Sequence, residues 1–256
     1  MKAVKIAAYC LEYTIYGLAA ITKSRYNDLV AVLYIVGTPI GNLGDITFRA
    51  LEVFKTVDYV ACEDTRQTLK LLTHFEIRKP LISCRSQNEA AAARTIIKLL
   101  SEGCSIAYAS DAGTPGLSDP GAVLVRMVRE AGYAVVPIPG VSAFAALLSV
   151  SGYPHTAVLF EGFLSPKPGR RKRRLQELCA LHIGFIVYES PFRILKLLQD
   201  IFDIDKNRTV VVGRELTKIH EELLAGSVLE VLQCLQERQA IKGEFSVFVS
   251  GNSFSN

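Results

Sequence analysis

The sequence predicts an α/β protein whose first half is built on a parallel sheet, and two observations carry this prediction. Short apolar runs of β type alternate regularly with segments of helical spacing between residues 32 and 150. The runs are too uniformly apolar for half-exposed strands, which indicates a sheet covered by helices on both faces. At three places an apolar run passes directly into a loop rich in Gly and Pro and then into a helical pattern. This order is typical of α/β folds that bind a ligand at the carboxyl ends of their strands.

Five strands and five helices are predicted in the first half. The strands are expected at residues 32–36, 58–62, 80–83, 104–109 and 134–138. The helices are expected at residues 47–57, 65–75, 88–100, 121–132 and 142–150. Residues 151–156 combine Gly, Pro and polar side chains, so a domain boundary is predicted there. The predicted domains are therefore residues 32–150 and residues 156–251.

The second half repeats the alternation with fewer elements. Strands are expected at residues 157–163, 184–190, 208–216 and 244–251. Helices are expected at residues 170–181 and 227–238, and one more is expected to begin at Pro191. Proline favours the first position of a helix, because the N–H that it lacks would have no partner there.

Composition and charge exclude several classes of protein. Half of the 256 residues are hydrophobic and 21% are charged, which is usual for a globular protein. The formal net charge is only +4, so nucleic-acid binding would need a local basic patch. The six cysteines form no C-x-x-C pair and the four histidines are scattered, so neither a disulfide framework nor a metal site is expected. No apolar run reaches the roughly 18 residues of a membrane span, and we expect a cytoplasmic protein.

The first loop follows the run at residues 32–36 and contains Gly37, Gly41 and Gly44. Their spacing is neither G-x-G-x-x-G nor G-x-x-x-x-G-K-[ST], the two common nucleotide motifs. Pro39 fixes one φ angle and removes one N–H, which disfavours a nest of amides around a phosphate. The loop therefore suits an organic ligand without phosphate, although a purely structural turn would use the same residues.

Two further loops of this kind follow the fourth and fifth predicted strands. The second is SDAGTPGLSDPG, residues 110–121, and the third is the Pro-Gly turn before Ser142. Parallel strands end at one edge of their sheet, so the three loops should lie together. The loops would then bring together the side chains of Asp111, Asp119 and Ser142. Such a group of polar side chains is more typical of a ligand site than of three structural turns.

Eight motifs in one order carry a family resemblance. They are TPIGNLGDIT, EDTR, SDAGTPGLSDPG, PIPGVSA, LFEGF, YESP, RELTK and KGEF. From about Leu33 to Ser250 the chain resembles the tetrapyrrole (corrin/porphyrin) methylase superfamily. Within it, the chain resembles the branch that methylates the ribose 2′-hydroxyl of a cytidine in 16S ribosomal RNA of the small ribosomal subunit. The resemblance implies a parallel N-terminal domain, a mixed-sheet C-terminal domain and a cofactor cleft between them.

The resemblance also implies an S-adenosylmethionine-dependent enzyme, normally a homodimer, with no metal. Its partners would be the small ribosomal subunit and its RNA. A cleft for this cofactor needs carbonyls, amides, one or two carboxylates and an apolar slot, and the loops provide that mixture. The candidate cofactor-binding residues are Pro39, Asp111, Gly113, Thr114, Leu117, Ser142, Ala143, Tyr188 and Arg214.

The candidate catalytic residues are Glu63, Asp64 and Arg66, which follow the second predicted strand. A carboxylate near a ribose hydroxyl can orient it or accept its proton, and Arg66 would grip a neighbouring phosphate. The alternative is structural, because Asp64 or Thr65 can cap the next helix and the acids favour its N-terminal dipole.

The roles of two acidic residues in the second half stay open, and one loop of the first half departs from the family pattern. Glu189 and Glu215 either face the substrate or pair with the nearby Arg193 and Arg214. Residues 83–89 (SCRSQNE) stand where the branch has a His- and Glu-rich stretch. Only the final two residues, Asn88 and Glu89, match the family pattern, so only for them does the resemblance imply a role.

The one dense basic run is Lys167–Arg174. Positive charges at a helix N-terminus oppose its dipole, and this cost favours a functional reason. Binding to RNA phosphates is the prediction, and a solvated helix face is the alternative. The candidate RNA-binding residues are Arg170, Arg171, Lys172, Arg173 and Arg174.

The basic run also separates three hypotheses about function. A ribosomal RNA methyltransferase leads. A methyltransferase of a tetrapyrrole small molecule is the alternative, but a planar polycarboxylate needs a few cations in a cleft rather than an exposed Arg cluster. An RNA-binding module without catalysis is the third, and the intact Gly-rich loops argue against it.

Residues 1–31 precede the first predicted strand and allow three interpretations. Lys2 and Lys5 before an apolar stretch suggest a secretory signal, which Glu12 interrupts. A short helix packed on the rest is the second. We favour the third, an N-terminal extension from an over-extended reading frame, because the resembled family begins close to Val32.

Overall fold

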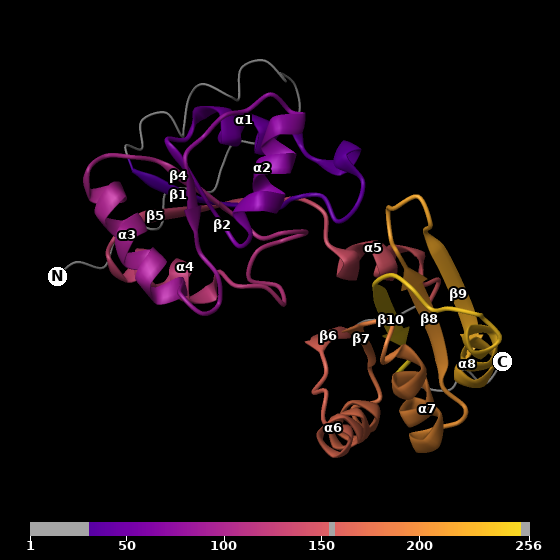
Figure 1. Cartoon of the computed structure of the whole chain (residues 1–256). Coiled ribbons are helices and arrows are strands. Elements are labelled where there is room, and N and C mark those ends of the chain that lie inside the picture. Colours follow the sequence, from indigo (N-terminus) through magenta and orange to yellow (C-terminus); the bar gives the residue numbers. More distant parts are fainter. Residues whose placement is uncertain (1–30, 154–156, 252–256) are drawn as a thin grey trace, which may run out of the picture. The chain divides into compact units, whose positions relative to one another are not determined.

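The computed structural model describes residues 31–153 and 157–251 (Figure 1). Apart from Ala31, the predicted N-terminal extension lies outside the described residues. Its three interpretations therefore stay open.

The first sheet has five parallel strands in the order β3-β2-β4-β1-β5. All five strands were predicted, with bounds that differ by two residues at most. The strands are β1 (Val32–Val36), β2 (Tyr59–Cys62), β3 (Leu81–Ser83), β4 (Ile106–Ala109) and β5 (Ala134–Ile138). Their parallel direction puts all five carboxyl ends, and the loops that follow them, at one edge.

Helices cover both faces of this sheet, as the apolar strands predict. On one face lie α1 (Phe48–Thr56) and α2 (Thr65–His74), and on the other α3 (Glu89–Ser101) and α4 (Ala122–Glu130) (Figure 1). The period of two along a strand explains this division, because successive side chains point to opposite faces. Val32 packs with α1, whereas its neighbour Leu33 packs with α3 and α4.

The second sheet is mixed and has the order β6-β7-β10-β8-β9. Only β6 and β7 run parallel, and the other neighbours are antiparallel. The strands are β6 (Val158–Phe163), β7 (Gly184–Glu189), β8 (Thr209–Arg214), β9 (Glu222–Ser227) and β10 (Phe245–Val249). The α/β class with one parallel and one mixed sheet is thus confirmed.

Two predictions for the second half were wrong in detail. No strand was predicted at β9, which is an edge strand that pairs only with β8. Edge strands lack the continuous apolar run of buried strands, and the sequence of β9 ends in Ala-Gly-Ser. The helix expected from Pro191 is α7 (Ile194–Ile204), because the N–H groups of Arg193 and Ile194 bond first to Ser190 O in a turn.

Helix α5 (Ala143–Val150) follows β5 in the chain but packs on the second sheet. Its Leu147 lies in one apolar cluster with Ile186, Val211 and Phe248. The opposite face of that sheet is covered by α6 (Pro168–Ala180), α7 and α8 (Val228–Gln236). Helix α5 therefore carries the third Gly-rich loop towards the second sheet. The predicted boundary at residues 151–156 stays a prediction.

Candidate active site

The three Gly-rich loops are joined to one another by hydrogen bonds. Thr38 and Gly113 form an isolated bridge, with N–H···O distances of 2.8 and 3.0 Å in the two directions. Thr114 Oγ1 donates to Val141 O at 3.3 Å, which connects the second loop to the third. The prediction that these loops lie together is therefore met by direct contacts.

The first and third loops touch backbone to backbone at Gly37 and Gly140. A Cβ added to Gly37 would lie 2.7 Å from Gly140 N, and one added to Gly140 would lie 2.7 Å from Gly37 C and O. Only glycine fits at either position, because both contacts are with backbone. The Pro-Gly turn of the third loop is thus a close-approach site.

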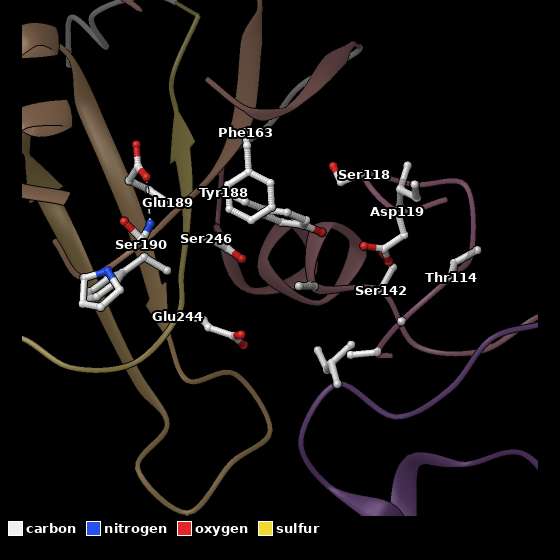
Figure 2. Close-up of a pocket in the computed structure, with 17 residues that line it drawn as sticks. Thr114, Ser118, Asp119, Ser142, Phe163, Tyr188, Glu189, Ser190, Glu244 and Ser246 are labelled. Atoms are coloured by element: carbon white, nitrogen blue, oxygen red, sulfur yellow. Dashed lines mark hydrogen bonds between the residues drawn. The ribbon is translucent and has the colours of Figure 1, made fainter. Parts of the chain in front are cut away.

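The loops form one wall of a cavity of about 450 Å³, which we call the loop cavity. This wall consists of Ile40, Ala112, Gly113, Thr114, Leu117, Ser118, Asp119, Ser142 and Ala143. Strand ends of the second sheet form the other wall. It consists of Phe163, Tyr188, Glu189, Ser190, Pro191, Glu244, Phe245 and Ser246. Figure 2 shows Thr114, Asp119 and Ser142 on one side, and Glu244 and Ser246 on the other.

Tyr188 joins the two walls. Its hydroxyl accepts a hydrogen bond of 2.8 Å from the N–H of Phe144, in the first turn of α5. Burial raises the pKa of the phenol, while hydrogen bonding from Phe144 opposes the shift. The ring of Phe163 meets the ring of Tyr188 edge to face at 5.7 Å. Tyr188 is therefore fixed in place as part of the cavity wall.

The charged side chains of the loop-cavity lining are all acidic, although two of them pair with cations outside that lining: Glu189 with Arg193 at 2.6 Å and Glu244 with Lys218 at 2.9 Å. Asp119, Glu189 and Glu244 line the cavity, and its described lining includes no Lys, Arg or His. Burial, with Asp111 as a nearby like charge, raises the pKa of Asp119. A cavity of this kind favours a ligand that brings a positive charge and disfavours one that brings phosphates.

Two buried polar atoms of this cavity have no hydrogen-bond partner in the part of the chain that the structure describes. Glu189 pairs with Arg193 at 2.6 Å through Oε1, but its Oε2 is buried without a hydrogen bond. Ser142 Oγ lies near the Tyr188 hydroxyl, yet no bond of acceptable geometry joins them. Such atoms are uncommon in a folded protein and often mark a place for a ligand or water.

A second cavity, of about 510 Å³, adjoins the first; we call it the α2 cavity. The two share Ile40, Ala112 and Glu244. The remaining lining of the α2 cavity is Thr38, Pro39, Gly41, Leu43, Gln67, Lys70, Leu71, Asp111 and Lys218.

The nine candidate cofactor-binding residues divide between these places. Six line the loop cavity: Gly113, Thr114, Leu117, Ser142, Ala143 and Tyr188. Pro39 and Asp111 line the α2 cavity, each next in sequence to a residue of the shared wall. Arg214 lines neither, because its Nε donates to Lys242 O at 2.7 Å and its NH1 contacts Glu222 at 3.4 Å. The role of all nine in cofactor binding stays a prediction.

The candidate catalytic residues lie beside Asp111. The N–H of Asp64 donates to Asp111 Oδ1 at 2.9 Å. Asp64 also caps α2 and pairs with Arg66 at 2.7 Å, and these bonds hold the pKa of Asp64 well below its usual range. Burial and the like charges of Asp111 and Asp119 instead raise the pKa of Glu63. Of the two acids, Asp64 therefore has the helix-capping role, and Glu63 is the better proton acceptor.

Other acidic side chains hold the loops in place. Glu215 pairs with Lys218 at 2.8 Å rather than with Arg214, whereas Glu189 does pair with Arg193. Glu89 is buried and accepts the N–H groups of Gly121 and Leu124 at 2.9 Å each. Glu89, one of the two residues here that match the family pattern, thus has a carboxylate that fixes the end of the second loop.

The basic run is largely paired within the chain. Arg171 is buried and contacts Asp200 at 2.7 Å, so its side chain is not available to RNA. Arg174 pairs with Glu161 and Glu177, Lys172 with Asp203, and Arg173 with Glu177. Of the five candidates, Arg170 makes no ion pair with the described residues. RNA binding by this run stays a prediction for its exposed members.

Sequence reasoning missed several lining residues. Phe163, Lys218 and Glu244 stand in the motifs LFEGF, RELTK and KGEF, so the signal was present but not assigned. Gln67 and Lys70 lie in no such motif, and only their spacing on α2 brings them to the cavity.

The described residues contain neither a membrane-spanning helix nor a cluster of metal ligands. None of their helices combines the length and apolar character needed to cross a bilayer. Within residues 31–153 and 157–251, His, Cys, Asp and Glu side chains form no group of three able to hold a metal ion.

Comparison with known proteins decides the family. The tetrapyrrole (corrin/porphyrin) methylases match residues 32–232. The chain belongs to this family. Its relatives include proteins named ribosomal RNA small subunit methyltransferase I. The one from Borrelia garinii is 46% identical over 223 residues, covering 87% of this chain and 100% of that protein. The one from Thermotoga maritima is 42% identical, covering 86% of this chain and 98% of that protein.

Solved methylases of the family share the fold at low identity. A cobalt precorrin-4 methyltransferase matches with a TM-score of 0.63 and 17% identity, over 86% of this chain and 94% of its own. A uroporphyrin-III-C-methyltransferase from Thermus thermophilus matches with a TM-score of 0.58 and 19% identity, over the same shares. The family's α/β architecture in this chain is confirmed by both.

Proposed function

We propose that this methylase transfers a methyl group from S-adenosylmethionine to the ribose 2′-hydroxyl of a cytidine in 16S ribosomal RNA of the small subunit. The names of its relatives support the RNA substrate. One observation carries the cofactor: the loop cavity is lined by carboxylates and apolar side chains without a basic residue.

The donor set of the loop cavity fits this cofactor. S-adenosylmethionine carries a sulfonium and an ammonium, so carboxylates are favoured around it. The residues that would hold it are Gly113, Thr114, Leu117, Ser142, Ala143 and Tyr188. The cofactor would also contact Pro39 and Asp111, which lie next to the wall that the two cavities share. By the family resemblance, Arg214 would contact the cofactor from the end of β8. The unpartnered Ser142 Oγ and Glu189 Oε2 add polar groups that a ligand can satisfy.

When bound, the cofactor supplies a methyl group on a positively charged sulfur. The protein has to hold the hydroxyl in line with that methyl group and exclude water, which can supply several kcal/mol. The chemistry that the cofactor would supply is transfer of this methyl group to the hydroxyl oxygen, and the residues of the chain would have to accept the proton that the hydroxyl loses. Glu63 lines neither cavity but lies beside Asp111, which lines the α2 cavity, and it is proposed to take this proton from there; burial, with the like charges of Asp111 and Asp119, raises its pKa and makes it the better acceptor.

Asp64 and Arg66 have a supporting part in this proposal. Their mutual ion pair leaves the Arg66 side chain 83% exposed, so it can still reach a phosphate of the RNA. The Asp64 backbone holds Asp111 in place through its N–H.

The decisive experiment uses labelled S-adenosylmethionine and small subunits from a strain that lacks the gene. We expect label in 2′-O-methylcytidine after digestion to nucleosides. Label in a base would contradict the ribose assignment. Binding of subunits without transfer would favour a non-catalytic RNA-binding module, and transfer only to a tetrapyrrole would favour the alternative methyltransferase.

We also propose a cytoplasmic homodimer. The homodimer is what the family resemblance implies, and Phe48, Phe192 and Ile219, which are 88%, 89% and 98% exposed, are the side chains we would test first for a place in its interface. Light scattering at micromolar protein should give the mass of two chains, and the mass of one chain would contradict the dimer.

A further inference from the structure

The α2 cavity lies directly against the loop cavity. It shares Ile40, Ala112 and Glu244 with the loop cavity, so a molecule in one lies against a molecule in the other. Its volume of about 510 Å³ is in the range of small-molecule sites.

The wall of this cavity formed by α2 comes from one helix face. Gln67, Lys70 and Leu71 are three and four positions apart, a spacing that places side chains together. Thr68 and Leu72, which alternate with them, are buried against the sheet. The amide, ammonium and apolar groups of this face therefore point into the cavity as a set.

Among the described residues, no carboxylate pairs with Lys70, the other cation of this cavity being Lys218. Lys70 is exposed. Lys218, by contrast, contacts two carboxylates, those of Glu215 at 2.8 Å and Glu244 at 2.9 Å, so its positive charge is already compensated within the protein. An unpaired ammonium in a cleft attracts an anion, and Lys binds phosphate as a point charge.

The balance of charges indicates one phosphate rather than a polyanion. Lys70 and Lys218 are matched by Asp111 and Glu244, so the lining has no net positive charge to offer a ligand with many carboxylates. A nucleotide brings one phosphate, a polar base edge and apolar ring faces. In the cavity, Lys70 can bind the phosphate and Gln67 can bind the base edge. Apolar side chains, such as those of Leu43 and Leu71, can pack on the ring faces.

We propose that the α2 cavity binds the nucleotide that receives the methyl group, with Lys70 on its phosphate and Gln67 on its base edge. This inference rests on the proposed function, because it takes RNA as the substrate. A nucleotide can enter such a cavity only when it is unstacked, which is how proteins usually read single-stranded RNA. Lys70 and Gln67 are then substrate-binding residues near the cofactor, separate from the basic run on α6.

The test compares Lys70→Glu with Lys55→Glu. Lys55 is an exposed lysine of the neighbouring helix α1 and lies outside both cavities. We measure binding to a fluorescent single-stranded RNA by anisotropy, and methyl transfer to unmethylated small subunits. Lys70→Glu should weaken RNA binding about tenfold more than Lys55→Glu, as expected for a lost charged contact.

Two further variants separate the contacts. Lys70→Ala should lower the slope of log affinity against log salt by about 0.7, the value for one phosphate of a single strand. Gln67→Ala should weaken RNA binding without changing that slope. Both should bind S-adenosylmethionine as the wild type does in calorimetry, since Gln67 and Lys70 lie on α2, apart from the wall that the two cavities share and from the residues next to it in sequence.

The outcomes separate this inference from the proposed function. Equal RNA binding and methyl transfer by Lys70→Glu and Lys55→Glu would overturn the inference while the function stands. A wild type that binds RNA through Lys70 but transfers no methyl group would overturn the function and support the binding site.

Discussion

The charged side chains that line the loop cavity differ from those at the start of α6 in how completely other side chains of the protein pair with them. In the loop cavity Asp119 makes no ion pair with the described residues, and Glu189 keeps a buried oxygen without a partner. On α6, carboxylates of α7, α6 and β6 pair with Arg171, Arg173 and Arg174 in turn, and Arg170 is the arginine of this run without an ion pair to the described residues. A dense run of charge is therefore a weaker sign of binding than a few polar groups whose partners the chain does not supply.

This comparison predicts that Arg171 acts in stability and not in RNA binding. Arg171→Gln leaves Asp200 without its partner inside the protein, so the free energy of unfolding should fall by about 3 kcal/mol. Chemical denaturation measures the loss. Arg170→Gln is the matched control, because Arg170 is exposed and should stay within about 0.5 kcal/mol of the wild type. Equal stability of the two variants would contradict the structural role of Arg171.

The contact between the first and third loops provides the next largest effect. Gly140→Ala puts a Cβ 2.7 Å from Gly37 C and O, so the loops must move apart. We expect a loss of about 2 kcal/mol in the free energy of unfolding, with weaker binding of S-adenosylmethionine. Gly169→Ala is the control: its Cβ meets nothing within 4 Å, and alanine favours the helix α6. A stable Gly140→Ala with unchanged binding would break the link between this contact and the cavity.

Asp111→Ala tests how far the cofactor site extends. Asp111 lines the α2 cavity beside the shared wall, and the family resemblance assigns it to the cofactor. The affinity for S-adenosylmethionine in calorimetry should fall at least tenfold, about 1.4 kcal/mol, with the melting temperature nearly unchanged. Wild-type affinity would restrict the cofactor to the loop cavity alone.

The smallest effect concerns the pH dependence of stability at Glu63. Its raised pKa means that the folded chain holds this proton more tightly than the unfolded chain. The free energy of unfolding should therefore fall as pH rises above the unfolded pKa, near 4.5. Glu63→Gln removes that loss, so wild type should lose stability relative to the variant over this window. A relative gain by the wild type, measured by denaturation at several pH values, would contradict the burial of this carboxyl.

The sequence was sufficient to predict the α/β class and the positions of the buried strands. Apolar runs and Gly-rich junctions are local signals, and β1 and its loop are both where the pattern predicts them. The edge strand β9 was missed because half-exposed residues give no such run. The order of the strands needs non-local pairing, which no local pattern contains.

For the site, sequence predicted the loops better than the partners of individual side chains. Ser142 and Tyr188 line the loop cavity, as the motifs indicate. The pairing of Arg171 with Asp200 joins α6 to α7, and because the two residues are 29 positions apart in the chain, no local pattern predicts it. Lys70 was missed for the same reason, since its cavity is formed by segments that only folding brings together.

The most direct test of the central claim is a calorimetric titration of S-adenosylmethionine into Ala143→Leu and Ala180→Leu. Ala143 lines the loop cavity, where a larger side chain takes up space that the ligand needs, whereas Ala180 is exposed at the end of α6. Affinity should fall at least tenfold in Ala143→Leu, about 1.4 kcal/mol, and stay at the wild-type value in Ala180→Leu. Wild-type affinity in both variants would contradict the assignment of the loop cavity to the cofactor.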